Sequence, residues 1–196
     1  MSVPRASVFI AVSVDGYIAR EDGSLDWLHG HGESDEGDHG YADFMASIDT
    51  LVMGRKTFEK VLTFGAWPYS GKRVVVLSSG SPLVPEELES EIEVLALEPE
   101  ALLRHLGSTG TESVYVDGGV TVQRFLRAGL VQELIVTRAP VLIGSGTPLF
   151  GSLPEDVRLE HVETRAFSNG LVQSRYRVLG AAELSSVHKS DEQARA

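Results

Sequence analysis

Short, nearly continuous apolar runs separated by polar segments organise the first part of the chain. The runs are rich in β-branched residues and lack the strict alternation of a strand with one face in water. Such runs are typical of strands buried on both faces, as in a parallel or mixed sheet covered by helices. The predicted strands are residues 6–14, 50–53, 73–77, 91–97 and 113–116.

Helical patterns fall between these strands. Pro99 suits the first turn of a helix, and Gly129 suits the position just past the end of one. The alternation of strands with helices predicts an α/β fold with a mostly parallel sheet. The expected helices are residues 43–48, residues 54–62, residues 99–106 and residues 121–127.

The pattern changes after Glu133, where strands follow one another without helical segments between them. The Asn169-Gly170 pair is a strong hairpin signal between the last two, so we expect the sheet to end antiparallel. These three strands are residues 134–137, 157–165 and 171–179. We expect one domain over residues 1–180 and a polar C-terminal tail over residues 181–196.

Residues 20–40 form a long polar segment with five glycines and three histidines. Loops of this length are more often functional than accidental, so we interpret it as a surface loop or lid. Trp27 either closes over a substrate or anchors the loop by packing, and the sequence leaves both readings open. The spacing of His29, His31 and His39 matches no closed set of metal ligands, so a solvated loop and no metal are expected.

Composition narrows the classes of function. The chain has no cysteine, which excludes disulfides, thiolate zinc sites and a cysteine nucleophile. Its formal net charge of −11 argues against nucleic acid and anionic membranes as partners. We find no apolar run long enough to span a membrane and no secretory signal pattern, and we expect a cytoplasmic protein.

Three predicted strand ends carry residues suited to anions. They are residues 54–57 (Gly-Arg-Lys-Thr), Ser78-Ser79 and residues 118–121 (Gly-Gly-Val-Thr). Ligands of open α/β sheets bind beyond the carboxyl ends of the strands, where helix N-termini present free N–H groups. Each segment alone could be a solvated helix start or a plain turn, and none is a Walker loop or a Rossmann fingerprint. Together they predict a phosphorylated dinucleotide, with NADPH preferred to NADH.

Several motifs of the chain resemble those of a known family. The matching motifs are residues 13–19 (SVDGYIA), residues 51–59 (LVMGRKTFE), residues 117–134 and residues 140–150. They resemble the dihydrofolate-reductase-like superfamily, and within it most closely the stand-alone relatives of the reductase domain of the bifunctional riboflavin-biosynthesis deaminase-reductase. The resemblance implies a central, mostly parallel eight-stranded sheet with an antiparallel C-terminal hairpin and helices on both faces. It also implies an NADPH site and a homodimer.

The resemblance also implies site residues. Ala11 and Ile18 would border the nicotinamide, and Phe44, Thr137 and Trp27 would lie on the substrate side. Phosphates on the adenosine side would be held by Gly54, Arg55, Lys56, Thr57, Ser78 and Ser79. The pyrophosphate would be held by Gly118, Gly119, Val120 and Thr121, with a cis Gly118–Gly119 bond as an option.

The chain departs from the family pattern on the substrate side. The position of the acidic residue of folate reductases falls near Gly40, which leaves Asp38 and Asp43 as neighbouring candidates for a proton donor. Lys72 replaces the arginine that grips the folate tail, so folate is not the first expectation. We expect an NADPH-dependent reductase that transfers hydride to a small heteroaromatic, imine or carbonyl substrate, of dihydrofolate-reductase or riboflavin-pathway type. The alternative is a non-catalytic NADPH-binding sensor or interaction module.

Overall fold

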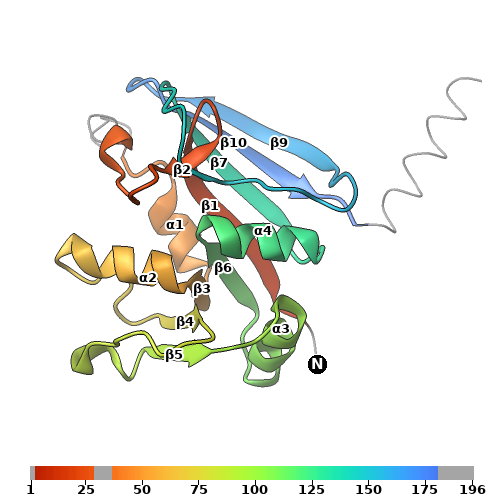
Figure 1. Cartoon of the computed structure of the whole chain (residues 1–196). Helices are drawn as coiled ribbons and strands as arrows, with labels where there is room; N and C mark the ends of the chain where they lie inside the picture. The colour runs from red at the N-terminus through yellow and green to blue at the C-terminus, as the bar shows by residue number, and fades with distance from the viewer. Residues whose placement is uncertain (1–2, 29–36, 181–196) are drawn as a thin grey trace, which may run out of the picture.

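The computed structural model describes residues 3–28 and 37–180, and eight strands within them form one sheet (Figure 1). From edge to edge the order is β5 (Ile92–Leu95), β4 (Arg73–Leu77), β3 (Thr50–Gly54), β6 (Ser113–Asp117), β1 (Arg5–Ser13), β7 (Glu133–Ala139), β10 (Val172–Val178) and β9 (Leu159–Ala166). Neighbours from β5 to β7 are parallel, whereas β10 is antiparallel to both β7 and β9. The mostly parallel eight-stranded sheet with an antiparallel C-terminal hairpin is confirmed.

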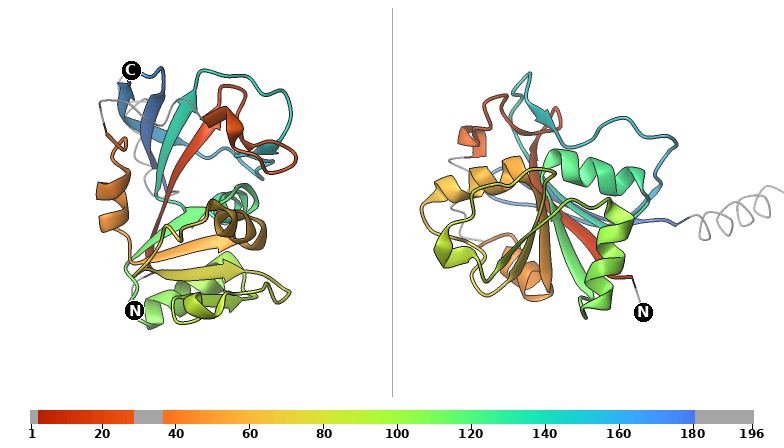
Figure 2. Two further views of the ribbon diagram at one scale, coloured as in Figure 1. Left: turned by 90° about the vertical axis from the view of Figure 1, so that its left-hand side faces the viewer. Right: turned by 60° about the horizontal axis from the view of Figure 1, so that its bottom comes forward.

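The helices of the described residues cover both faces of this sheet, as expected (Figures 1 and 2). Helices α1 and α2 lie on one face, and α3 and α4 lie on the other. Their bounds are α1 (Tyr41–Ala46), α2 (Arg55–Val61), α3 (Pro99–Ser108) and α4 (Gly119–Arg127), with short 3-10 turns η1 (Asp26–Leu28), η2 (Leu62–Phe64) and η3 (Glu86–Leu88). None of the helices within the described ranges has the length and apolar character needed to cross a membrane.

Two cores, one on each face, explain why the strand sequences are almost continuously apolar. Successive residues of a strand point to opposite faces. Leu51 and Met53 of β3 therefore pack with α1 and α2, while Val52 between them packs with α3 and α4. In β6, Tyr115 joins the first core and Val116 the second.

The β9–β10 hairpin has much less cover. No residue of β9 is buried, and only Ser174 is buried in β10. Its turn is the one predicted from Asn169-Gly170, with Gly170 at φ 85° and Asn169 Oδ1 accepting the N–H of Leu171 at 3.2 Å. The hairpin is fixed to the sheet by its pairing with β7.

The structure differs from the sequence-based expectations in three respects. Strands β2 (Tyr17–Ala19) and β8 (Thr147–Pro148) form a separate small antiparallel sheet, too short to leave a hydrophobic pattern. Helix α1 and helix α4 each begin two residues earlier than expected. The optional cis bond is wrong, because all peptide bonds of the described residues are trans, and Gly118 makes the turn with φ 88° instead.

Candidate functional site

The carboxyl ends of β3, β4 and β6 lie at one edge of the sheet. These strands are adjacent and parallel, and their register pairs Gly54 with Leu77 and Met53 with Asp117. The segments that follow the strands, which begin at Arg55, Ser78 and Gly118, therefore start side by side. The three predicted anion-binding segments are brought together here.

Arg55 and the turn after β4 are in direct proximity. A Cβ added to Gly80 would lie 3.6 Å from Arg55 Nη1 and 3.9 Å from Ser78 Oγ, which itself accepts the Gly80 N–H at 3.1 Å. Arg55 Nε donates to Glu59 Oε1 at 2.6 Å, one turn along α2. The Arg55 side chain is 53% exposed, so its guanidinium remains open to a ligand. Lys56 and Ser79 next to it are also exposed.

The two strand–helix junctions fit against each other through glycines and threonines. A Cβ on Gly54 would lie 2.9 Å from Thr121 Oγ1, and a Cβ on Gly118 would collide with Thr57 Oγ1. A Cβ on Gly119 would meet Pro148 O at 2.9 Å. No side chain fits at these glycines, so the two strand–helix junctions pack closely against each other, with their backbone at the start of α4.

These junctions fit the phosphates of a dinucleotide. The glycine backbone and the start of α4 offer N–H groups, while Arg55 and Lys56 offer positive charge. Val120, the second residue of α4, is 67% exposed. Positive charge and an exposed helix start are thus found at the strand ends where the sequence predicts the cofactor.

The nicotinamide side of the expected site lies on β1 and β7. Ala11 pairs with Thr137 across these two strands. Thr137 is 5% exposed, and its Oγ1 accepts a hydrogen bond from Gln173 Nε2 at 3.1 Å. Ile18 of β2 reaches back towards α4, because its Cδ1 would lie 3.2 Å from a Cβ on Gly119. The structure thus joins the nicotinamide-side residues to the pyrophosphate-side glycines.

Trp27 and Phe44 are both buried, in different clusters. Trp27 is 6% exposed and packs with Ala139, Leu171 and Ala11. Its Nε1 is buried without a hydrogen-bond partner in the described structure. Phe44 packs among aromatic rings on the α1 face of the sheet. Trp27 therefore anchors its loop next to Ala11, which places it near the expected nicotinamide.

The two candidate proton donors point away from the sheet. Asp43 is exposed on α1. Asp38 is exposed too, and its carboxylate accepts the N–H groups of Gly40 at 3.1 Å and Ala42 at 2.6 Å, so it stabilises the start of the helix. The helix brings neither carboxyl inward. His29 and His31 lie outside the described residues. The described residues contain no cluster of three or more possible metal ligands.

A different carboxyl group, which the sequence reasoning passed over, lies at the end of β6. Asp117 Oδ1 accepts the N–H of Gly118 at 2.7 Å. Burial raises the pKa of Asp117 to about 6, against smaller lowering effects of this bond and of the Tyr115 hydroxyl. A carboxyl group with a pKa near neutrality at the ligand edge of a sheet is suited to proton transfer.

Three tyrosines surround this carboxyl group. Burial, and then the negative charge of Asp117, raise the pKa of Tyr41 to about 12 and also raise the pKa values of Tyr69 and Tyr115 well above the usual range. The Tyr115 hydroxyl also donates to Phe9 O at 2.8 Å. One sequence signal could have found the group, because Asp117 ends a buried strand two residues after Tyr115 and so shares its face.

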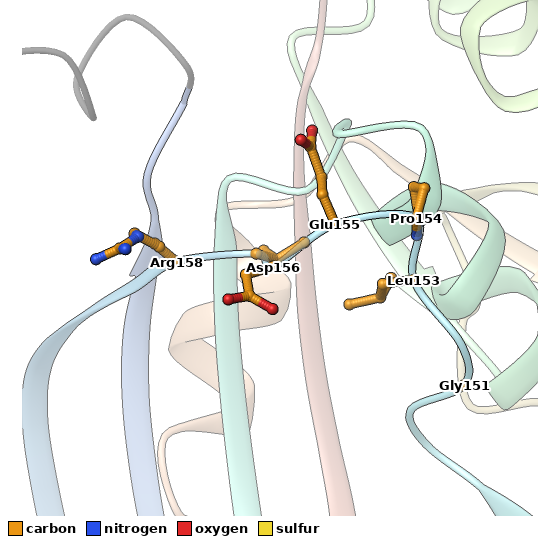
Figure 3. Close-up of a pocket in the computed structure, with 7 residues that line it drawn as sticks. Gly151, Leu153, Pro154, Glu155, Asp156 and Arg158 are labelled. Carbon is orange, nitrogen blue, oxygen red and sulfur yellow. The ribbon is translucent and has the colours of Figure 1, made fainter.

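A hollow of about 830 Å³ lies elsewhere, along the loop that joins β8 to β9 (Figure 3). It is lined by Gly151, Leu153, Pro154, Glu155, Asp156, Val157 and Arg158. None of the predicted site residues lines it. Its walls come from one exposed loop, so we assign it no role in the chemistry.

Comparisons with known proteins agree with this architecture. The chain matches the RibD C-terminal domain family over residues 4–173. It is 37% identical to the uncharacterized protein YwjB of Bacillus subtilis (strain 168) over 170 residues. This match covers 85% of this chain and 94% of YwjB. The crystal structure of a putative riboflavin biosynthesis protein from Shewanella sp. PV-4 has a TM-score of 0.84 and 38% identity, over 90% of this chain and 99% of that one.

A more distant structure shares the fold alone. Dihydrofolate reductase from Enterococcus faecalis, solved with NADP(H) and RAB-propyl, has a TM-score of 0.62 and 19% identity, over 90% of this chain and 97% of that one. The resemblance inferred from the motifs is confirmed. The chain belongs to the RibD C-terminal domain family within the dihydrofolate-reductase-like fold, and this membership supports a reductase-type function.

Proposed function

We propose that the protein is an NADPH-dependent oxidoreductase that reduces the C=N or C=O bond of a small heteroaromatic, imine or carbonyl substrate. The observation that carries this proposal is the meeting of the ends of β3, β4 and β6 at one edge of the sheet, with Arg55 beside the Ser78–Gly80 turn and Gly118 against Thr57. A fold-level likeness to a dihydrofolate reductase solved with NADP(H) supports it.

Each group of residues has a separate task in this proposal. Arg55, Lys56 and Ser78 hold the additional phosphate that distinguishes NADPH from NADH. The backbone of Gly118 and Gly119 holds the pyrophosphate. When bound, NADPH supplies the hydride. The protein mainly orients the two reactants and excludes water from between them.

In this proposal, Asp117 is the proton donor. A pKa of about 6 lets its carboxyl group hold a proton in a useful fraction of molecules near neutral pH and release it to a substrate nitrogen or oxygen. Asp38 and Asp43 stay weaker candidates, because both are exposed. Asp117 also favours an enzyme over a non-catalytic NADPH-binding module, since a module that only binds the cofactor has no use for a titratable group there.

Replacement of Arg55 by alanine tests the phosphate assignment. We expect the dissociation constant of NADPH to rise by about tenfold or more, because charge-assisted hydrogen bonds contribute roughly 1.5–3 kcal/mol. The dissociation constant of NADH should change much less. Fluorescence titration of both nucleotides measures this difference.

Arg104→Ala is the matched control, because Arg104 is an exposed arginine of α3 that loses the same charge. If Arg55→Ala bound NADPH as tightly as the parent protein, or if the parent bound NADH as well as NADPH, the phosphate pocket would be misassigned. Binding of NADPH without oxidation across a panel of imines, pterins and carbonyls would instead favour the non-catalytic module.

A further inference from the structure

Acidic residues are concentrated in one continuous part of the chain. Residues 21–54 contain no lysine or arginine and nine carboxylates, so they account for −9 of the formal net charge of −11. The nine are Glu21, Asp22, Asp26, Glu33, Asp35, Glu36, Asp38, Asp43 and Asp49. The run ends at Arg55 and Lys56, the pair that opens the proposed phosphate site.

Trp27 and helix α1 of this segment lie next to β1 on the substrate side of the proposed site, whereas Asp49 lies at the opposite, amino end of β3 and accepts the N–H groups of Glu112 and Ser113. Trp27 packs against Ala139 of β7 and Ala11 of β1. On α1, the rings of Tyr41 and Phe44 lie 5.4 and 5.0 Å from that of Phe9 of β1. The segment without positive charge therefore adjoins the strands on which the substrate would be reduced.

Asp117 forms no ion pair in the described structure, unlike Glu133 and Glu93. Glu133 binds Arg5 and Arg175, and Glu93 binds Arg73. The groups that act on the Asp117 carboxyl are the Gly118 N–H and the Tyr115 hydroxyl, and no lysine or arginine contributes. A carboxylate removed from water without a counter-charge is unfavourable, and a positively charged ligand would relieve this.

Aromatic side chains complete the surroundings of Asp117. The rings of Tyr41, Tyr69 and Tyr115 are near enough for its charge to affect their ionisation. Electron-rich ring faces attract cations, by roughly 0.5–2 kcal/mol each when water is excluded. An anionic substrate group, in contrast, would be repelled by the ionised Asp117 carboxylate.

We propose, on the basis of the reductase function above, that the substrate is an organic cation. Its class is a small iminium ion or N-substituted heteroaromatic cation that carries neither phosphate nor carboxylate. Asp117 provides the counter-charge for the cationic nitrogen, and the neighbouring aromatic rings contribute cation–π attraction. The additional phosphate of NADPH and the charge of the substrate are thus recognised by opposite ends of one site.

The chemistry of such a substrate balances without a separate acid. One hydride, carrying two electrons, is added to the iminium carbon, and the C=N π electrons become the nitrogen lone pair. The products are a neutral tertiary amine and NADP⁺. A neutral imine becomes an iminium ion by first taking a proton from Asp117, and addition of hydride to that ion gives a neutral secondary amine. This removes the need for an acidic residue at Gly40.

Equilibrium binding of three matched rings, measured without NADPH so that none of them is reduced, tests the proposal. The probes are N-methylisoquinolinium, isoquinoline and isoquinoline-3-carboxylate, titrated calorimetrically into the full chain at about pH 8, where Asp117 is ionised. We expect the cation to bind about tenfold or more tightly than the neutral ring and the anion to bind most weakly. Equal binding of the cation and the anion, or no binding of the cation, would overturn the proposal.

Variants of Asp117 assign the effect to this residue. Asp117→Asn should weaken cation binding by about tenfold while changing isoquinoline binding by less than about threefold, and Asp117→Glu should keep the preference for the cation. Glu100→Gln, an exposed carboxylate of α3, is the control for loss of one negative charge. If Asp117→Asn weakened the binding of the cation and of isoquinoline equally, the assignment to Asp117 would be wrong. An unchanged far-ultraviolet circular dichroism spectrum confirms that the variant is folded.

The cofactor measurements keep this proposal separate from the reductase function. The isoquinoline titrations need no NADPH, so they measure the charge preference independently of the cofactor. If the protein did not bind NADPH, the proposed reductase function would be wrong, and the preference for a cation would still be tested. With NADPH bound, N-methyl-3,4-dihydroisoquinolinium should be reduced to the tertiary amine. If only neutral or anionic substrates were reduced, the protein would be a reductase and the inference on charge would be wrong.

Discussion

At the scale of single residues, Asp117 links the stability of the protein to its proposed chemistry. The pKa of this group is raised from 3.8 to about 6 by burial. The folded state therefore binds more protons than the unfolded state between these two values. The stabilising contribution is fully present below about pH 4 and is lost as the pH rises through about 6.

Asp117→Asn should remove this pH dependence. Between pH 4 and pH 8, the parent protein should lose up to about 3 kcal/mol of unfolding free energy relative to the variant. Urea unfolding at several pH values measures it. The comparison with the variant is needed because carboxyls with a lowered pKa, such as Asp49, act in the opposite direction. A constant difference across this range would mean that Asp117 titrates normally.

Single residues also show where sequence reasoning succeeded and failed. The glycine-containing segments at Gly54 and Gly118 were recognisable because they recur with Ser78-Ser79 at the ends of predicted parallel strands, where ligands of such sheets bind. Asp117 was overlooked because a carboxyl group at a strand end looks like an ordinary turn residue. Its pKa is raised by burial in the folded protein, and its charge acts on Tyr41, Tyr69 and Tyr115, which come from three separate segments.

At the scale of elements, an ion-pair network fixes the hairpin to the parallel part of the sheet. Glu133, at the start of β7, is 9% exposed. Its carboxylate accepts from Arg5 Nη2 of β1 at 3.3 Å and from Arg175 Nε of β10 at 2.8 Å. It joins three neighbouring strands at the edge of the sheet opposite to the proposed site.

Glu133→Gln should lower the unfolding free energy by about 1–2 kcal/mol. The amide loses charge-assisted hydrogen bonds, but both arginines are partly exposed and regain water. Glu160→Gln is the control, because Glu160 pairs with Arg177 on the exposed side of the hairpin and should lose less than about 1 kcal/mol. Equal losses in urea unfolding would show that the network adds nothing beyond a surface pair.

The elements themselves were largely predictable. Buried strands such as β4 and β6 showed as short apolar runs, because residues packed on both faces cannot alternate in polarity. Strands β2 and β8 could not be predicted, since two or three residues carry no period. Their pairing depends on the loops that bring Tyr17 and Pro148 together.

At the scale of the whole molecule, the expected domain boundary can be compared with the extent of the described elements. The last strand, β10, ends at Val178, and both cores are formed by residues before this point. The single domain over residues 1–180, the homodimer and the cytoplasmic location stay predictions.

A chain that ends at Gly180 should fold as the full chain does. If residues 181–196 are a tail, as the sequence predicts, we expect the melting temperature to lie within about 2 °C of the parent value, because changes away from packed residues alter stability by about 0.5 kcal/mol or less. Circular dichroism during heating measures it. A chain that ends at Gly170 is the control, since it removes β10 and should not fold. A much larger drop for the first truncation would place residues 181–196 within the cooperative domain.

The sequence by itself determined the class of fold, the order of its main strands and helices, and the three segments that suit phosphate. These depend on local polarity and on glycine positions, which are written directly in the chain. The tertiary structure was needed to show that Asp38 and Asp43 are exposed and that Asp117 lies near tyrosines without forming an ion pair. Burial and charge pairing arise between residues distant in sequence, so no local pattern could have revealed them.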